Sequence, residues 1–178
     1  MHKILFDNSG SMSELGKEAL LINTLRFSRQ YTEFNNVQET VEYYQASHRI
    51  DEIKIENNKD ILISEPKGKC SDELLSNWLL SQGEASILWI TDGYVNFSEA
   101  DIFKLSSCPN ISIVALGCDA DIDQLKRLKT GLYTVENIET ALAQFFTPQV
   151  AHFILPKKVA DITVADSSWE DQSDDDEW

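Results

Sequence analysis

The sequence predicts an α/β protein with an open, mostly parallel sheet of about six strands, one antiparallel edge strand, and helices on both faces. Three observations predict this class. Short apolar runs alternate with amphipathic runs of helical spacing, which is typical of parallel crossovers. The run over residues 110–117 is almost continuously apolar, as in strands buried on both faces. Polar motifs follow two of the apolar runs, where open α/β sheets bind ligands.

The first half of the chain supplies a strand, a helix and an edge of the sheet. Residues 4–6 predict a buried strand, and residues 13 to about 30 predict a helix with Ser13 as its N-cap. Residues 37–46 are rich in β-forming side chains and predict a second strand. Short alternating runs at 53–55 and 61–63 predict an edge hairpin, where Lys54 and Lys59 discourage further pairing.

The second half repeats the alternation and then changes character. Helices are predicted at 72–82, about 98–106, 122–129 and 138–146, and strands at 85–90, 110–117 and 132–135. These elements define a domain over residues 1–147. Short apolar pieces after Pro148 predict a C-terminal extension or strap over residues 148–165. From Asp166 to Trp178, seven of thirteen residues are acidic and none is basic, which predicts a disordered acidic tail.

Composition narrows the class of function. A formal net charge of −15 and a pI near 4.4 disfavour binding to nucleic-acid phosphates or anionic membranes, and favour basic partners or divalent cations. No apolar run approaches the roughly 20 residues that span a bilayer. The first strand begins too early to leave room for a signal peptide. Three cysteines, an odd number, argue against a disulfide framework. We therefore expect a cytoplasmic protein.

The residues that carry chemistry follow the first and fourth buried strands. Asp7-x-Ser9-x-Ser11 places one carboxylate and two hydroxyls at the end of the first strand, and Asp92 follows the strand at 85–90 in Thr91-Asp92-Gly93. These are hard oxygen donors, which suit Mg²⁺, Mn²⁺ or Ca²⁺ better than zinc. Each motif alone is also compatible with an ordinary turn or helix cap. Together they predict a divalent-cation site.

The two motifs resemble the metal-ion-dependent adhesion site, or MIDAS, of von Willebrand factor A (vWA) domains. The resemblance spans about residues 1–147 and implies a Rossmann-like sheet. It implies that Ser9 and Ser11 bind the cation directly, and that Asp7 and Asp92 bind it directly or through water. The family has a Thr at a third position, where this chain offers Ser71 or Cys70; Ser71 is favoured, because a thiol is a poor ligand for Mg²⁺.

The resemblance implies a non-enzymatic module that binds a partner protein, whose Glu or Asp completes the shell of the cation. Small bacterial proteins of this kind are commonly adaptors of AAA+ ATPases of the MoxR type, or components of stress and defence systems. One alternative is an acidic inhibitor or decoy that blocks a basic surface with its charged tail. Another is a metal-dependent hydrolase using Asp7 and Asp92, which has less support because no nucleophile, general base or phosphate-binding glycine loop accompanies them.

Overall fold

A computed structural model describes residues 1–55 and 61–147 of the chain, so the predicted extension and acidic tail lie outside the described residues. The strands are β1 (His2–Asp7), β2 (Val41–Ala46), β3 (Ile50–Ile53), β4 (Ser86–Thr91), β5 (Ile111–Ala115) and β6 (Gly131–Thr134). They form one sheet in the order β3-β2-β1-β4-β5-β6. Only the β2–β3 pair of this sheet is antiparallel. The predicted fold class is confirmed.

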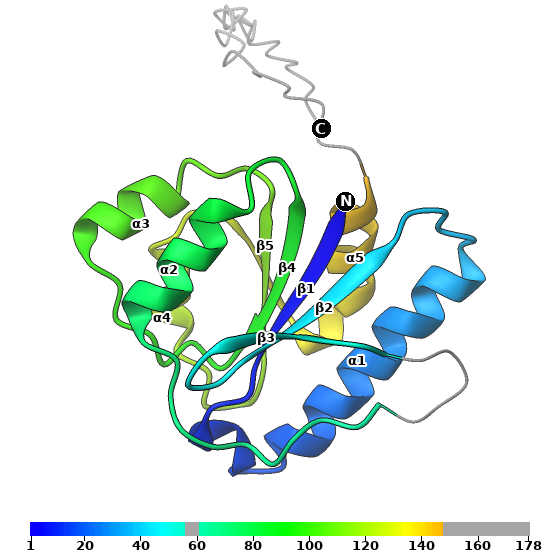
Figure 1. Ribbon diagram of the computed structural model, residues 1–178, viewed down its shortest axis with the longest axis horizontal. Helices are drawn as coiled ribbons and strands as arrows, with labels where there is room; N and C mark the ends of the chain where they lie inside the picture. The colour runs from blue at the N-terminus through cyan, green and yellow to red at the C-terminus, as the bar shows by residue number, and fades with distance from the viewer. Residues whose placement is uncertain (56–60, 148–178) are drawn as a thin grey trace, which may run out of the picture.

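Helices cover both faces of the sheet (Figure 1). On one face lie α1 (Lys17–Phe34) and α5 (Ile138–Phe146), and on the other lie α2 (Asp72–Ser81), α3 (Glu99–Leu105) and α4 (Ile122–Lys126). Two short 3₁₀ turns, η1 (Gly10–Ser13) and η2 (Val135–Asn137), precede α1 and α5. The described chain is therefore a three-layer α/β sandwich.

Alternation along the central strands explains why their sequences are apolar throughout. In β1, Ile4 and Phe6 pack with the cluster under α1 and α5, whereas Leu5 packs with the cluster under α2, α3 and α4. In β4, Leu88 and Trp89 divide in the same way. Successive side chains of a strand point to opposite faces, so a strand covered on both sides needs apolar residues at every position.

The predicted edge hairpin is wrong in its pairing. β3 pairs with β2 through the tight turn of residues 47–49, and residues 61–63 form no strand. Instead, Ile61 is buried in the core while Leu62 is 85% exposed. The Asn8 side chain donates hydrogen bonds to the backbone oxygen and the hydroxyl of Ser64, at 3.0 and 3.1 Å. Core packing and this anchor hold the segment, so its alternation does not require a ladder of backbone hydrogen bonds.

The first helix begins four residues later than predicted. Leu15 and Gly16 both adopt a left-handed backbone conformation, with φ of 51° and 75°, which interrupts any helix starting at Ser13. Glycine adopts this conformation freely, whereas for leucine it is strained. The interruption separates η1 from α1 and makes Lys17 the first residue of the helix.

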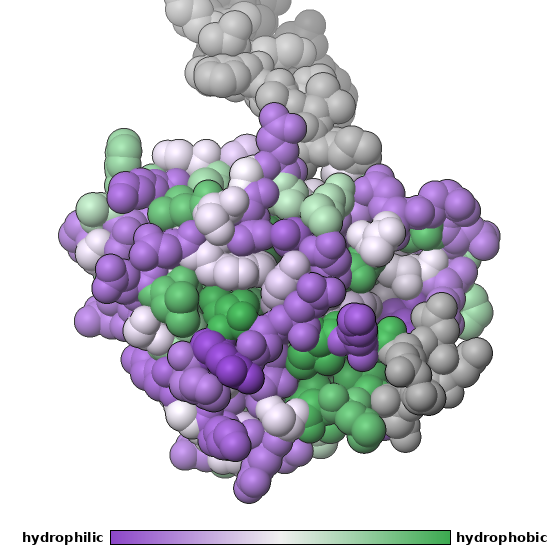
Figure 2. All heavy atoms as spheres, viewed as in Figure 1, coloured by the Kyte–Doolittle hydropathy of each residue, from purple (hydrophilic) through white to green (hydrophobic). Residues whose placement is uncertain are grey.

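The face of the described chain drawn in Figure 2 is predominantly polar. Figure 2 shows charged and polar residues over most of one face, with apolar residues gathered in smaller patches between them. Among residues 1–55 and 61–147, no helix has the length and hydropathy required to cross a bilayer.

The topology reverses direction at β1, which lies between β2 and β4. The chain runs from β1 to β2 on one side and later crosses to β4 on the other. Register pairs Phe6 with Ile90, so the ends of the two strands, Asp7 and Thr91, lie next to each other. The carboxyl edge at such a reversal is where open α/β sheets bind ligands.

Candidate functional site

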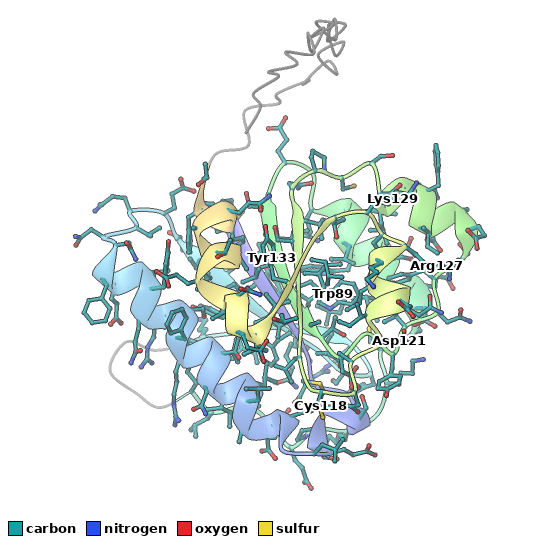
Figure 3. All side chains as sticks on the ribbon, turned by 180° about the vertical axis from the view of Figure 1, so that it is seen from behind. Trp89, Cys118, Asp121, Arg127, Lys129 and Tyr133 are labelled. Carbon is teal, nitrogen blue, oxygen red and sulfur yellow. The ribbon has the colours of Figure 1, made fainter. Side chains whose placement is uncertain are left out.

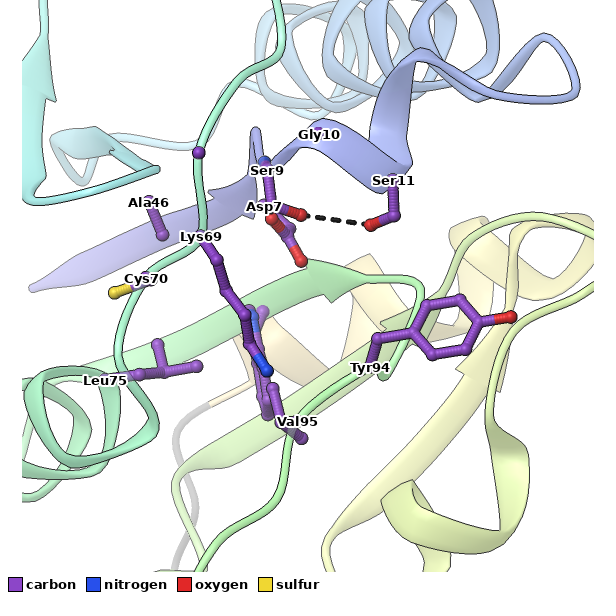
Figure 4. A pocket seen from close by; sticks show the side chains of 12 residues that line it. Asp7, Ser9, Gly10, Ser11, Ala46, Lys69, Cys70, Leu75, Tyr94 and Val95 are labelled. Atoms are coloured by element: carbon purple, nitrogen blue, oxygen red, sulfur yellow. Dashed lines mark hydrogen bonds between the residues drawn. The ribbon is translucent and has the colours of Figure 1, made fainter.

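The first motif forms a compact group of oxygen atoms at the end of β1. Asp7 accepts hydrogen bonds from the backbone N–H of Ser9, at 2.8 Å, and from the hydroxyl of Thr91, at 3.1 Å. The hydroxyl oxygens of Ser9 and Ser11 lie 3.1 Å apart (Figure 4). The structure therefore brings three of the five predicted ligands, Asp7, Ser9 and Ser11, to one place.

The spacing of these oxygens suits a small divalent cation. Mg²⁺ binds six oxygens octahedrally at about 2.1 Å, so neighbouring ligands lie about 3.0 Å apart. The distance between the Ser9 and Ser11 hydroxyls is close to that value. Among residues 1–55 and 61–147, no three His, Cys, Asp or Glu side chains are grouped to hold a metal. A cation at this site would therefore depend on hydroxyl ligands and water as well as on Asp7.

Burial perturbs the Asp7 carboxylate. Removal from water raises the pKa of Asp7, and the nearby charge of Asp92 raises it further, while hydrogen bonds from Ser9 and Thr91 lower it. The net shift is upward. A cation beside Asp7 would offset the cost of holding this carboxylate ionised in a low-dielectric site.

Asp92 lies beside this group, but its carboxylate forms hydrogen bonds with other residues. It is fully buried, and its Oδ2 accepts a hydrogen bond from the Lys17 ammonium at 3.0 Å. Its Oδ1 accepts from the backbone N–H of Tyr94 at 3.4 Å. Asp92 does not line the pocket onto which Asp7 opens. The structure thus places Asp92 behind the site, with a lysine as its counter-ion.

At the third position of the site, neither Cys70 nor Ser71 has a side chain that is free to bind a cation. Burial, with the charges of Asp7 and Asp72, raises the pKa of the Cys70 thiol to about 11, which keeps it protonated. Figure 4 shows its sulfur turned away from Asp7 and Ser11. The Ser71 hydroxyl accepts a hydrogen bond from the backbone N–H of Leu74 at 3.2 Å, which makes it the N-cap of α2.

We expect Ser71→Ala to lower the free energy of unfolding by about 1 kcal/mol through loss of this cap, without changing Mn²⁺ affinity. Urea denaturation and isothermal titration calorimetry would measure the two quantities. Ser98→Ala is the matched control, because Ser98 caps α3 in the same way through the Asp101 N–H. A loss of Mn²⁺ affinity in Ser71→Ala alone would instead assign Ser71 to the metal.

The oxygen group opens onto a pocket of about 190 Å³. One side of the pocket is polar, with Asp7, Ser9 and Ser11, and the other is apolar, with Leu75, Trp89 and Val95 among its lining residues. The Lys69 side chain extends across the pocket toward Val95 (Figure 4). The site is therefore a shallow opening with room for a side chain of another molecule.

Sequence reasoning missed Lys17, although a signal was present. Lys17, Leu21 and Leu25 recur at intervals of four, which places them on one face of α1, and all three are fully buried. A lysine in line with buried leucines predicts a buried charge, which requires a partner. Its second partner, Asp119, follows β5, whose sequence offered no comparable signal.

The pocket lies at the reversal of the sheet, where open α/β folds bind ligands. Comparison with solved structures identifies which of these folds the chain has. Manganese-loaded TRAP protein from Plasmodium vivax matches with a TM-score of 0.58 at 11% identity, over 82% of this chain and 72% of that chain. The SpRpn10 vWA domain matches with a TM-score of 0.52 at 10% identity, over 78% of this chain and 92% of that one.

A third match is proximal thread matrix protein 1 from the mussel byssus, solved with a zinc-occupied MIDAS motif. Its TM-score is 0.54 at 12% identity, over 81% of this chain and 46% of that chain, so this chain spans less than half of the mussel protein. No sequence-family model and no curated protein matches the chain. The chain has the vWA fold.

Proposed function

We propose that the chain is a non-enzymatic interaction module in which Asp7, Ser9 and Ser11 hold a divalent cation, Mg²⁺ in the first instance. The observation that carries this proposal is the convergence of these three oxygen donors on an open pocket at the reversal of the sheet. The manganese in TRAP and the zinc in the mussel protein support a divalent cation in this fold.

The surroundings of the pocket favour a protein as the partner. Tyr94, which lines the pocket, is 49% exposed, and Leu15, four residues after Ser11 in the chain, is 74% exposed. Leu15 also has a strained positive φ. Exposed apolar side chains and backbone strain gather at binding surfaces more often than on inert ones. We propose that a partner Glu or Asp completes the cation's shell while neighbouring partner residues cover Leu15 and Tyr94.

The chemistry of the pocket gives little support to an enzyme. No histidine of residues 1–55 and 61–147 lines it, and the Cys70 thiol is protonated rather than nucleophilic. A binding module needs only the cation and the surface around it. Within this proposal, an AAA+ ATPase of the MoxR type is the partner suggested by the resemblance to bacterial vWA adaptors, and a cytoplasmic location follows from it.

Asp7→Ala tests the proposal directly. We expect Mn²⁺ affinity, measured by calorimetry, to fall by more than about tenfold, because the variant loses the ionised ligand. Partner capture from the native lysate should succeed with Mg²⁺ and fail with EDTA or with Asp7→Ala. Asp123→Ala removes a carboxylate whose side chain is 94% exposed and should behave as the parent chain does. A partner retained in EDTA and by Asp7→Ala would move attention to the acidic residues 166–178.

A further inference from the structure

Lys17 is a fully buried lysine at the edge of the candidate site. Its ammonium lies 3.0 Å from Asp92 Oδ2 and 2.7 Å from Asp119 Oδ2. It also lies 5.3 Å from the centre of the Tyr94 ring, within the range of a cation–π contact. Three groups from two separate segments, the loops after β4 and β5, therefore converge on one buried cation.

The packing shows that this arrangement is built rather than incidental. Gly117 has a φ of +100°, and a Cβ on it would lie 2.9 Å from Lys17 Cε, so a side chain there would displace the lysine. The Tyr94 hydroxyl donates to the backbone oxygen of Asp119 at 3.1 Å, which ties the two segments together. Figure 3 places Cys118, between Gly117 and Asp119, at the same end of the sheet as Asp121. The loop after β5 thus closes around the ammonium.

Lys17 remains charged in this setting. Desolvation lowers its pKa, but the hydrogen bonds and charges of Asp119 and Asp92 outweigh that effect and leave the pKa above its usual value. The hydrogen bond from Lys17 in turn lowers the pKa of Asp119. Lys17 is therefore a fixed positive charge at neutral pH, shared between Asp92 and Asp119.

We infer that Lys17 is a built-in counter-cation of the site, which neutralises Asp92 and so lowers the affinity of the Asp7-Ser9-Ser11 position for a divalent metal. This inference rests on the proposed function, because it concerns the strength of the same metal site. The effect is electrostatic. The ammonium, 3.0 Å from Asp92 Oδ2, repels a second cation nearby, and this repulsion offsets the attraction that the Asp92 carboxylate exerts on that cation.

The consequence is a site of restrained affinity. With Asp92 engaged, Asp7 supplies the ionised oxygen, and the two serine hydroxyls supply neutral ones. Affinity for hard cations rises with the number of charged ligands. We therefore expect metal occupancy to depend on the partner's carboxylate, so that metal and partner bind the chain cooperatively.

The test is the Mn²⁺ affinity of full-length variants, measured by isothermal titration calorimetry. Lys17→Met and Lys17→Gln both remove the charge, and Gln retains a hydrogen-bond donor. We expect both to bind Mn²⁺ at least about tenfold more tightly than the parent chain. Lys126→Met is the matched control, because it removes the same charge from a 65% exposed side chain that does not line the pocket, and it should leave Mn²⁺ affinity unchanged.

Each result has a distinct meaning. Equal Mn²⁺ affinity in the parent chain, Lys17→Met and Lys17→Gln would overturn the inference while leaving the proposed function intact. Equal gains in Lys126→Met and Lys17→Met would also overturn it, by showing a general charge effect. Failure of the parent chain and both Lys17 variants to bind Mn²⁺ would instead reject the metal site itself. If a variant is unfolded without metal, the Mn²⁺ dependence of its far-ultraviolet circular dichroism replaces the titration, and refolding at saturating Mn²⁺ is the expected result.

Discussion

Lys17→Met should lower the free energy of unfolding by about 3–5 kcal/mol in the absence of divalent metal, because it leaves the Asp92 carboxylate buried without its counter-ion. Asp92 is fully buried, and its other oxygen has a single long hydrogen bond to Tyr94 N–H. Loss of the lysine costs less at the Asp119 carboxylate, since this side chain is 26% exposed and can be hydrated. Urea denaturation at neutral pH with EDTA measures the loss.

A double substitution separates the contribution of the ion pair to stability from the contribution of the volume that its side chains fill. Lys17→Met with Asp92→Asn removes both charges and preserves most of the volume, so the double variant should recover most of the stability lost in Lys17→Met. Lys126→Met removes a largely exposed lysine and should change stability by no more than about 0.5 kcal/mol. If the effects of the two single substitutions simply add, Lys17 and Asp92 are not energetically coupled, and the account given for this cluster fails.

The fold was predictable because the relevant physics is local and repetitive. A short, almost continuously apolar run such as residues 110–117 favours a strand buried on both faces, and observed β5 is buried at every position. Placing D-x-S-x-S and T-D-G at strand ends was enough to bring Asp7 next to Thr91, since the ends of neighbouring parallel strands share an edge. That β1 and β4 are neighbours was implied by the family resemblance, not by the pattern of apolar runs, and the strand order confirms it.

The remaining features depend on contacts between distant segments. Residues 61–63 alternate like a strand, but their register with the core is set by Asn8, more than 50 positions earlier. The sequence predicts Asp92 as a metal ligand, whereas in the structure its carboxylate pairs with Lys17, which lies 75 positions earlier in the chain. Such pairings are properties of the packed structure.

Gly93→Ala should be the other strongly destabilising change. Gly93 has a φ of +83°, and an added Cβ would lie 2.9 Å from the backbone oxygen of Asp121 and about 3 Å from the side chain of Leu125. The Asp121 backbone cannot easily move, since its N–H donates to the backbone oxygen of Asp92 at 2.8 Å and its backbone oxygen accepts from the Leu125 N–H at 3.2 Å. We expect a loss of about 2–5 kcal/mol, combining the left-handed backbone penalty with overpacking.

Gly83→Ala isolates the backbone contribution, because Gly83 has a φ of +62° and an added Cβ would meet nothing within 4 Å. It should lose only about 1–2 kcal/mol, and the difference between the two variants in urea denaturation then measures the clash at Gly93. Similar losses of stability in Gly93→Ala and Gly83→Ala would show that Asp121 moves aside without lowering the free energy of unfolding. The clash pushes against Asp121 just beyond Gly117 and Asp119, so Gly93→Ala should also loosen the loop that holds Lys17 and thereby weaken the coupling between Lys17 and Asp92.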